Sequence, residues 1–555
     1  MRSTIIMFCL SMTHLSLNAQ PQKTTLFNPQ NGVVFKTNDK ALQNLYDLAE
    51  SKCLNNIKNF NQYKVLVEGA GYPFVWLETQ PMGGEMYAKR NIEVAKNNQV
   101  IFMDYQRADG RLPGMISYDR GLATIHAHYG WLQGFCFPEP ALNLYYWLNK
   151  DAQYLQRLYN CLERFDQYLW KTRDSDGNGC LESWCVYDTG EDNSVRLDGA
   201  TLEWNQETAP DKARIASSKE EIQNIAYKGI LPVPMESMDV MSYSHSARAV
   251  LAKIAKILHN GQEQIWMKKS EQVRAKIKSY LWDPSKFACY DRNSENKQMN
   301  ILLSNNIRCM YYGSFDQQMA DDFIAKHLLN LKEFWTAMPL PTIAANDPAF
   351  KNIANNNWSG QPQGLTFQRA IRALENYGHY AELTLVGTRL IQTLKQNIKF
   401  TQQYDPFTRK ANNSPDGYGP TILSLLEYLS RMYGIHYDAD RITWSGLHSR
   451  TDSSIYEQVV NGKKYSLQIN NDHLSAFIND KHIFQCSPNV RCITDMDGKI
   501  LSMVGIDTVQ RKVKLTIPNE KTYHLEIKPN CIYQINKKKQ LKLKKRIPFT
   551  YQPQA

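Results

Sequence analysis

The chain has 555 residues, of which 43% are hydrophobic and 11% aromatic, so it can bury a large core and is too long for one small domain. This composition excludes a largely disordered chain. Of the formal charge of +11, seven positive charges fall in one tail, INKKKQLKLKKR (535–546), and the rest of the chain is nearly balanced. We interpret the tail as a strand edge protected by lysines, with an acidic partner surface as the alternative. No nucleic-acid-binding motif accompanies it.

The N-terminal segment MRSTIIMFCLSMTHLSLNAQ combines a basic start, a short apolar run and a small-residue cleavage point near Ala19. It predicts a secretory signal peptide over residues 1–19 and therefore a protein that is exported to the periplasm or beyond the cell. No later stretch reaches the ~18 apolar residues of a membrane helix, so we expect no membrane span.

The eleven cysteines form neither a CxxC motif nor a zinc-binding pattern. Two pairs, Cys180 with Cys185 and Cys486 with Cys492, are close enough in sequence to form disulfides in an exported protein. Buried free thiols explain the same residues equally well, because cysteine is often buried.

Helical periodicity dominates from about residue 38 to residue 434. In SHSARAVLAKIAKILHNG (244–261) and TILSLLEYLSRMYG (421–434) apolar residues recur on one stripe, and Gly261 and Gly434 occupy the expected C-terminal cap positions. Long loops separate the helices at 72–84, 174–198 and 339–364, and long ordered loops are usually functional. Helical hairpins joined by such loops at one end predict an (α/α)6 toroid whose loops surround a central cleft.

After Tyr437 the period changes to two. The run EQVV-NG-KKYSLQI predicts a β-hairpin that turns at Asn461-Gly462. We therefore predict a mainly α protein with a toroid over residues 20–437, followed by a small antiparallel β-sandwich with the basic tail over residues 438–555.

The segment RDSDGNGCLE has alternating oxygen-bearing side chains that are typical of a calcium loop. The candidate ligands are Asp174, Asp176, Asn178 and Glu182. The loop lacks the glutamate that a complete calcium loop carries at its twelfth position, and an Asx-rich turn is the alternative. We expect no required cofactor, with a structural Ca²⁺ as one interpretation of this loop.

The next segment, DTGEDNS, contains Asp188, Glu191 and Asp192 close to aromatic residues. Glycoside hydrolysis needs two carboxyl groups, one protonated to assist the leaving group and one ionised to activate water or attack. A carboxyl group among aromatics and other acids has reason for a raised pKa. An acidic surface turn is the competing interpretation.

Three segments carry a resemblance to a known clan. DGNGCLE … DTGEDNS resembles the frame "DGDG-x-x-E … ESG-x-DNS", NNWSGQPQGLTFQRAIRALENYGHY resembles a "WRGP" loop with its following helix, and FTQQYDPFTRK resembles "F-x-E-x-YDP-x-T". Over residues 65–435 the chain is thus similar to the inverting (α/α)6-toroid glycosidases of families 63 and 37. The resemblance implies that Asp192 is the general acid.

The third segment departs from the clan, because Gln402 stands where the clan has its general base, and an amide cannot accept a proton from water. The other candidate bases are Glu85, Glu78 and Asp405. Glu78, in WLETQ, is interpreted mainly as a ligand of sugar hydroxyls. Glu85 lies seven residues further, two helical turns that would place both acids on one face. Its alternative role is a surface pair with Lys89.

The tryptophans at 76, 184 and 358 lie in loop motifs rather than on helix stripes, which favours sugar stacking. His126 and His128 lack a third metal ligand nearby, so we predict hydrogen-bonded histidines without zinc. The residues predicted to bind substrate are Trp76, Trp184, Tyr187, Asn193, Trp358, Gln361 and Gln402.

The sequence and its resemblance together predict an exported, exo-acting glycosidase that cleaves an α-linked glucoside or a related oligosaccharide by inversion. Two alternatives stay open. A phosphorylase of the same fold needs no base, since phosphate attacks directly, and a carbohydrate-binding protein that has lost its base would bind glycans without turnover.

Overall fold

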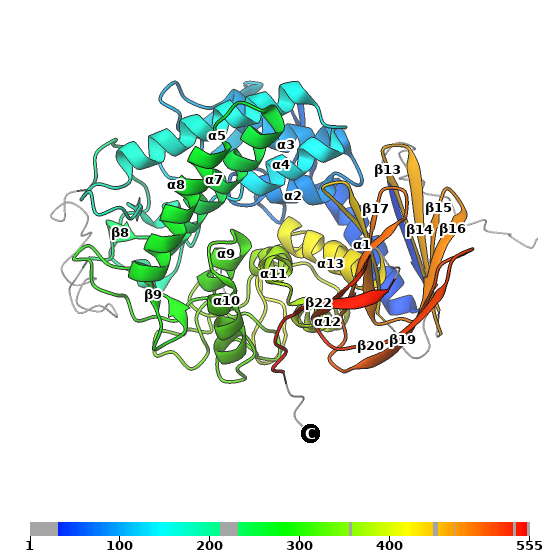
Figure 1. Cartoon of the computed structure of the whole chain (residues 1–555). Coiled ribbons are helices and arrows are strands. Elements are labelled where there is room, and N and C mark those ends of the chain that lie inside the picture. Colours follow the sequence, from blue (N-terminus) through cyan, green and yellow to red (C-terminus); the bar gives the residue numbers. More distant parts are fainter. Residues whose placement is uncertain are drawn as a thin grey trace, which may run out of the picture.

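The computed structural model describes residues 32–210, 231–354, 358–447, 453–470, 472–536 and 540–551; the predicted signal peptide at residues 1–19 lies outside them. Helices occupy about the first three quarters of the described chain, from Lys40 to Tyr433 (Figure 1). Their bounds are α1 (Lys40–Asn55), α2 (Gln80–Tyr87), α3 (Ile92–Asp104), α4 (Pro138–Trp147), α5 (Ala152–Thr172), α7 (Met238–Leu258), α8 (Glu263–Lys276), α9 (Asn305–Tyr311), α10 (Gln317–Phe323), α11 (Gly364–Tyr377), α12 (Tyr380–Asn397) and α13 (Gly419–Tyr433).

Six helices of the described chain form a closed ring. In order around the ring they are α2, α4, α7, α9, α11 and α13; each packs against the next, and α13 returns to α2. Outside them, α1 packs on α13, α3 on α2, α5 on α4 and α7, α8 on α7, and α12 on α11 and α13. Alternation of inner and outer helices confirms the predicted (α/α)6 toroid.

Local sequence explains where these helices begin and end. The Ser237 side chain accepts from the backbone N–H of Val240 and caps the start of α7, as a hydroxyl at an N-cap does. The helix ends at Leu258, three residues before the glycine expected to cap it, because His259 itself adopts the left-handed conformation (φ 52°) at the C-cap. Helix α13 begins with Gly419 and Pro420, and nearly all of its residues are buried because it belongs to the inner ring.

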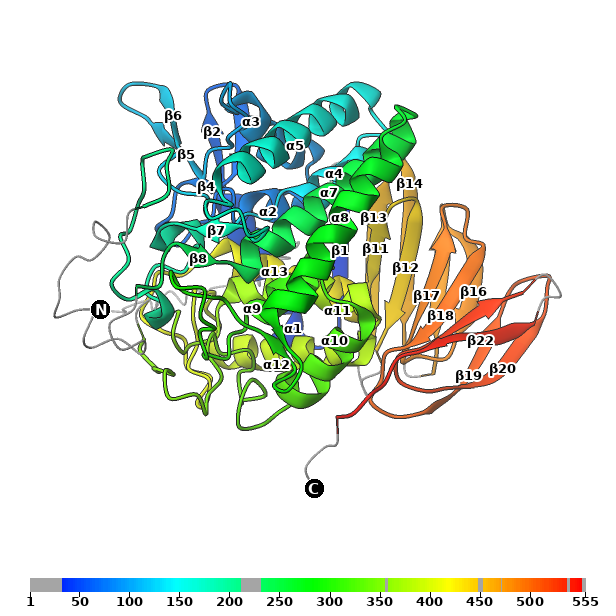
Figure 2. The same cartoon turned by 60° about the vertical axis from the view of Figure 1, so that its left-hand side comes forward.

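The C-terminal region is an antiparallel pair of sheets (Figure 2). A seven-stranded sheet has the order β1 (Gly32–Thr37), β13 (Ser454–Val460), β14 (Lys463–Ile469), β15 (Leu474–Ile478), β16 (Lys481–Cys486), β19 (Arg511–Thr516) and β20 (Thr522–Ile527). A six-stranded sheet has the order β11 (Ile435–Asp438), β12 (Arg441–Gly446), β17 (Val490–Asp495), β18 (Ile500–Gly505), β21 (Cys531–Ile535) and β22 (Leu541–Arg546).

Three features of these sheets bear on the sequence predictions. The hairpin β13–β14 turns at Asn461 and Gly462, whose φ angles of 48° and 78° are those of a type I′ turn, as predicted. Residues 541–546 of the basic tail form β22, the edge of the six-stranded sheet. Strand β1 pairs with β13, so an N-terminal segment that precedes the toroid helices completes the β-sandwich.

Short strands brace the loops that join the helices. These are β2 (Ile57–Phe60), β3 (Tyr63–Leu66), β4 (Val75–Trp76), β5 (Met115–Asp119), β6 (Thr124–His128), β7 (Glu182–Ser183), β8 (Met235–Glu236), β9 (Trp282–Asp283) and β10 (Ala288–Cys289). All ten cysteines of the described residues are buried free thiols. None of the described helices combines the length and apolarity that a bilayer span requires.

The inner ring has two distinct ends. Side chains just before or at the N-termini of the inner helices contact one another across the ring: Glu78 before α2, Gln133 before α4, Arg308 in α9 and Arg369 in α11. The later turns of the same helices, together with β11, β12 and β17, enclose a separate cavity. The N-terminal end therefore gathers the long loops, and the β-sandwich packs toward the other end (Figure 2).

Candidate active site

The loop DTGEDNS, between β7 and α7, contains three acids with different surroundings. Asp188 is buried, and its carboxylate accepts from the backbone N–H of Leu132 (2.6 Å) and of Trp184 (2.7 Å) and pairs with the buried Arg173. Contacts from three other segments thus fix the loop around this one side chain. Asp188 shapes the loop and is not available for chemistry.

Glu191 is equally occupied. Its Oε2 lies 2.9 Å from a guanidinium nitrogen of Arg196, and its Oε1 lies 3.0 Å from Arg308 and accepts from Asn305 at 2.6 Å. Glu191 is 2% exposed, so its charge is neutralised by two arginines away from water. Buried acids paired in this way hold structure together and are costly to break.

Asp192 differs from both, because it is half-exposed at the N-terminal end of the ring. Its negative charge raises the pKa of Tyr72 and of Tyr187, after the larger effect of burial, so both phenols lie near it. It also acts on Glu68, a buried acid on the loop that precedes α2. Of the three acids in the loop, Asp192 is thus the one placed to meet a substrate.

Glu78 lies at the same end of the ring, held by three partners. Its Oε1 is 3.2 Å from Arg369 and 3.7 Å from Arg308, and its Oε2 accepts from the Gln133 amide at 3.1 Å. Gly190 approaches it so closely that a Cβ there would lie 2.5 Å from Oε2. Burial raises the pKa of Glu78, and the two arginines oppose that rise.

Glu68 was not among the predicted site residues. It follows β3 and is 7% exposed, and its Oε1 accepts a hydrogen bond of 2.9 Å from the hydroxyl of Tyr418, just before α13. Burial raises its pKa well above the usual range, and the charge of Glu78 and then that of Asp192 raise it further, against the Tyr418 hydrogen bond. Three carboxyl groups, at 68, 78 and 192, therefore interact at this end of the ring.

Gln402, at the position where the clan has its base, belongs to the same group of residues. The hydroxyl of Tyr72 donates to its Oε1 at 3.3 Å, and the rings of Tyr72 and Tyr418 lie edge to face with centroids 6.4 Å apart. Gln402 and Glu68 are thus bound by two tyrosines that contact each other.

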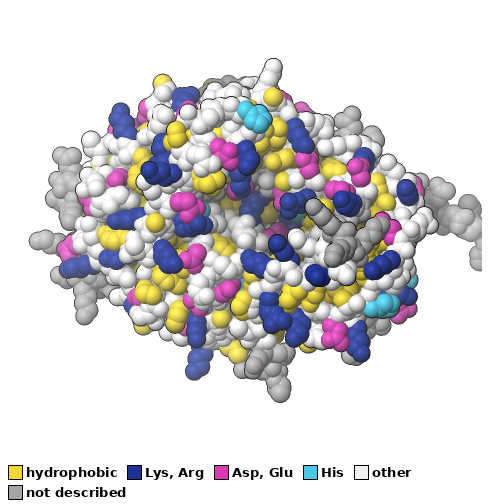
Figure 3. Space-filling model, viewed as in Figure 1, with side chains coloured by type: hydrophobic (Ala, Val, Ile, Leu, Met, Phe, Trp, Pro, Cys, Tyr) yellow, Lys and Arg dark blue, Asp and Glu magenta, His cyan; other side chains and the backbone are white. Residues whose placement is uncertain are grey.

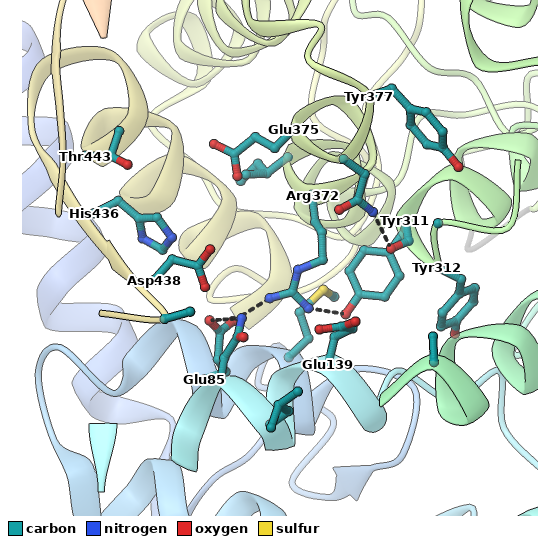
Figure 4. Close-up of a pocket in the computed structure, with 18 of the residues that line it drawn as sticks. Glu85, Glu139, Tyr311, Tyr312, Arg372, Glu375, Tyr377, His436, Asp438 and Thr443 are labelled. Atoms are coloured by element: carbon teal, nitrogen blue, oxygen red, sulfur yellow. Dashed lines mark hydrogen bonds and ion pairs between the residues drawn. The ribbon is translucent and has the colours of Figure 1, made fainter. Parts of the chain in front are cut away.

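Glu85 lies in a different place from Glu78. Glu78 lies in the turn before α2, whereas Glu85 is the sixth residue of that helix, about 7.5 Å along its axis from the first helical residue and toward the other end of the ring. The seven-residue spacing therefore does not place both acids on one helix face. Glu85 lines a cavity of about 790 Å³, where its Oε2 is 3.4 Å from Arg372 and its Oε1 accepts from Asn143. Figure 4 shows Arg372 between Glu85 and Tyr311 in this cavity. In the space-filling view of Figure 3 a hollow is visible near the centre of the molecule.

The carboxylate of Asp405 accepts hydrogen bonds from the turn that begins at this residue. Its Oδ1 accepts from the backbone N–H groups of Phe407 and Thr408, and its Oδ2 accepts from Asn352 at 2.7 Å. Burial would raise the pKa of Asp405, but these hydrogen bonds stabilise the ionised form and hold the pKa below its usual value. The structure therefore brings neither Glu85 nor Asp405 into contact with the group around Asp192.

The predicted aromatic residues divide into two sets. Trp76 and Tyr187 are partly exposed and pack on the same small cluster as Trp131, and of these residues Tyr187 feels the charge of Asp192. Trp184 is 1% exposed, with its ring under Arg173 and its N–H on Glu182, so it packs inside the loop. Trp358 is also buried and lines a small cavity with Arg308 and Arg369.

The remaining predicted polar residues surround the same end of the ring. The backbone carbonyl of the exposed Asn193 accepts from Ser359 at 3.1 Å, which joins the acidic loop to the loop before α11. On that second loop, Gln361 donates to Asn352 at 3.0 Å, and its own Oε1 is buried without a hydrogen-bond partner.

His126 and His128 share one face of β6, as a spacing of two on a strand requires. His128 forms a 3.0 Å hydrogen bond with Ser117 and stacks on Trp131. Neither histidine belongs to a metal-binding group within the described part of the chain.

The structure brings one further acid to the predicted calcium loop. The carboxylates of Asp176, Glu182 and Glu236 each have an oxygen within 4.8 Å of the others. Glu236 lies opposite Glu182 in the β7–β8 pair, and its buried Oε2 accepts no hydrogen bond from an N–H or O–H group of the described residues. Asn178 bonds both Asp176 and Glu236, whereas Asp174 caps the turn through the N–H of Gly179. Hard oxygen donors, one of them this buried Glu236 oxygen, fit Ca²⁺.

Seven residues at the candidate site or the calcium loop were not predicted, because their positions depend on contacts between segments that are far apart in the sequence. They are Glu68, Tyr72, Gln133, Glu236, Arg308, Arg369 and Tyr418. For Glu68 the available signal was its place in VEGAGYP, a glycine-rich loop directly after a predicted strand.

Comparison with known proteins identifies the family of the chain. The family model of the mannosylglycerate hydrolase MGH1-like glycoside hydrolase domain matches residues 74–419, which is more than half of the chain. The match contains Asp192, Glu78 and Gln402 and ends at Gly419, the first residue of α13.

Solved structures share the fold. The GH63 mannosylglycerate hydrolase of Thermus thermophilus in complex with glucose is 16% identical, with a TM-score of 0.54, over 70% of this chain and 99% of that one. Its complex with Tris and D-glycerate is 17% identical, with a TM-score of 0.53, over 69% of this chain and 99% of that one. A sialidase is 12% identical with a TM-score of 0.60, over 84% of this chain and 42% of that one. At these identities the likeness shows the fold alone, and it is the family match that decides: the chain belongs to the MGH1-like glycoside hydrolase family and is a glycosidase.

Proposed function

We propose that the chain is an inverting, exo-acting glycosidase in which Asp192 protonates the glycosidic oxygen of an α-linked glucoside or a related sugar. One observation carries the assignment: of the three acids in DTGEDNS, two are buried against arginines and Asp192 alone is half-exposed. Tyr187 lies near Asp192, and Trp76 packs on the same small cluster as Tyr187; both rings are partly exposed and suit contact with a sugar. Glu78, fixed by two arginines, offers acceptor oxygens to sugar hydroxyls.

The test is hydrolysis of a panel of α-glucosides and α-mannosides by the wild type and by Asp192→Asn. Mannosides belong in the panel because the family is named after a mannosylglycerate hydrolase. Loss of a general acid costs about 10²–10⁴-fold in rate, and NMR of the first-formed sugar reports whether the anomeric configuration is inverted. An Asp192→Asn variant as fast as the wild type would remove Asp192 from the mechanism.

A phosphorylase is the second candidate because of Gln402. A phosphorylase must bind phosphate, and the arginines of this site are already engaged: Arg308 and Arg369 are each paired with Glu78, and Arg308 also with Glu191. Hydrolysis is therefore favoured. Phosphate-dependent release of a sugar phosphate would favour the phosphorylase instead.

We propose in addition that the chain is exported through its N-terminal signal peptide and that Asp176, Glu182 and Glu236 hold a structural Ca²⁺. The ion would neutralise three crowded carboxylates and tie β7 to β8, below the acidic loop. N-terminal sequencing of the secreted protein tests the cleavage point near Ala19.

A further inference from the structure

The proposed hydrolysis needs a second carboxylate, and the expected position holds an amide. Neither of the other acids suggested by the sequence fills the gap. Glu85 is bound to Arg372 in the opposite cavity, and Asp405 is bound by its own turn. Glu78 shares its oxygens with Arg369, Arg308 and Gln133, which neutralise it and leave little capacity to accept a proton.

The carboxylate of Glu68 pairs with no arginine of the described residues, whereas its backbone is held in place by hydrogen bonds. Its N–H donates to Phe74 (3.2 Å), and its carbonyl accepts from Gly419 (2.7 Å), so the loop before α2 is fastened to the start of α13. Gly69 fits between Asn56 and Gly417 with no room for a Cβ. The side chain is therefore held at one position without an arginine bound to it among the described residues.

The two oxygens of Glu68 have different roles. Oε1 accepts from Tyr418, a bond that orients the carboxylate. Oε2 has no hydrogen-bond partner within the described ranges, so it can accept a proton from water. Tyr72, whose hydroxyl donates to Gln402, has its ring against Tyr418, and its phenol feels the charges of both Glu68 and Asp192. The free carboxylate oxygen thus belongs to the same small group as Gln402 and Asp192.

We infer that Glu68 is the general base of this glycosidase and takes the role that Gln402 cannot perform; this inference rests on the proposed inverting hydrolysis. Glu68 removes one proton from a water molecule as the water oxygen forms a bond to the anomeric carbon. Asp192 gives its proton to the glycosidic oxygen as the bond from that oxygen to the anomeric carbon breaks. The products are an inverted sugar and the free alcohol, with Glu68 protonated and Asp192 ionised, and exchange with water restores both.

The electrostatic surroundings suit this division of labour. A base works best when its pKa is close to the working pH, and burial with the negative neighbours Glu78 and Asp192 raises the pKa of Glu68. Gln402 keeps a role as a hydrogen-bonding partner of Tyr72.

The experiment compares Glu68→Gln and Asp192→Asn on two substrates: the best glycoside of the panel and the corresponding α-glycosyl fluoride. Fluoride leaves without protonation, so the fluoride needs the base and not the acid. We expect Glu68→Gln to lose about 10²–10⁴-fold on both substrates, and Asp192→Asn to lose activity on the glycoside while retaining much of it on the fluoride. Glu139→Gln, which changes an acid of the opposite cavity paired with Lys253, is the matched control and should behave as the wild type.

Two further readouts separate chemistry from folding. Glu68→Gln retains the bond from Tyr418 and removes a buried charge, so its unfolding midpoint should be equal to or above that of the wild type. In Glu68→Ala, azide in the vacated space should attack the anomeric carbon and yield a glycosyl azide of inverted configuration. A lower midpoint with no azide product would assign Glu68 to structure and overturn the inference.

The experiment distinguishes a wrong assignment of the general base from a wrong assignment of the function. A wild type that cleaves neither glycosides nor fluorides overturns the function and the base together. An active wild type with an equally active Glu68→Gln variant overturns the base alone.

Discussion

Tyr418 donates a hydrogen bond of 2.9 Å to Glu68 across 350 positions of sequence. The bond joins the loops before α2 and α13, two neighbours in the inner ring, and orients a buried carboxylate beside Asp192. The hydrogen bond therefore connects two neighbouring helices of the ring and also stabilises the ionised form of Glu68. The pH dependence of activity should change when this bond is removed.

The first prediction concerns that pH dependence. As a base, Glu68 must be ionised, so kcat/KM falls as pH drops through its pKa. Burial, Glu78 and Asp192 raise that pKa above the ordinary 4.5, while Tyr418 and Arg369 lower it. Tyr418→Phe removes a stabilising bond to the ionised form, worth ~1.5 kcal/mol, and should move the acid limb about one pH unit higher.

The measurement is the pH profile of kcat/KM for the wild type and Tyr418→Phe. Tyr437→Phe is the control, because the Tyr437 hydroxyl donates to the carbonyl of Tyr146, near the opposite cavity. An unchanged acid limb in Tyr418→Phe would show that Glu68 does not set it.

The second prediction concerns the buried pair that shapes the acidic loop. Asp188→Asn leaves Arg173, 1% exposed, without its counter-ion, and should lower the free energy of unfolding by about 3–5 kcal/mol. Asp480→Asn removes a surface pair with Lys464 and should cost less than about 1 kcal/mol. Thermal unfolding followed by circular dichroism compares them, and equal midpoints would contradict the structural role of Asp188.

The third prediction concerns the proposed calcium site. A ligand that binds only the folded state at one hundred times its Kd stabilises that state by about 2.7 kcal/mol, so Ca²⁺ should raise the unfolding midpoint and a chelator should lower it. Glu236→Gln should abolish the response, whereas Asp480→Asn should retain it. A wild-type midpoint that does not change with Ca²⁺ would rule out this site.

The fourth prediction separates the two ends of the ring. Glu85→Gln breaks an ion pair with Arg372 in the opposite cavity and should leave kcat/KM and its pH profile unchanged. Glu78→Gln replaces the carboxylate that pairs with Arg369 and Arg308 by a neutral amide. It should raise KM, because the carboxylate of Glu78 is placed to bind sugar hydroxyls. If the Glu85→Gln variant is folded but inactive, the catalytic residues do not lie at the N-terminal end of the inner ring, around Asp192.

Much of the fold follows from periodicity. The apolar stripe of 244–261 became α7, the run 421–434 became most of α13, and Asn461-Gly462 became a type I′ hairpin turn. Each depends on neighbours within a few residues. The same holds for the acidic loop, because Asp192 could be identified from the local frame DTGEDNS.

The site could be predicted only where a motif is local. Glu78 and Glu85 were predicted to share a helix face, yet Glu78 precedes α2 and Glu85 lies within it, at the wall of another cavity. Glu236 joins Asp176 and Glu182 only through the pairing of β7 with β8. Glu182 was predicted as a ligand, but Glu236 lies in a segment without any calcium motif.

The sequence alone thus determined the helical and β regions, the clan and the candidate acid, because these depend on residues close together in the chain. Only the tertiary structure decided which acids face one another. The closing of six inner helices into a ring brings the loop of Glu68, the loop of Asp192 and the start of α13 to one end, and no local pattern records a contact between segments so far apart.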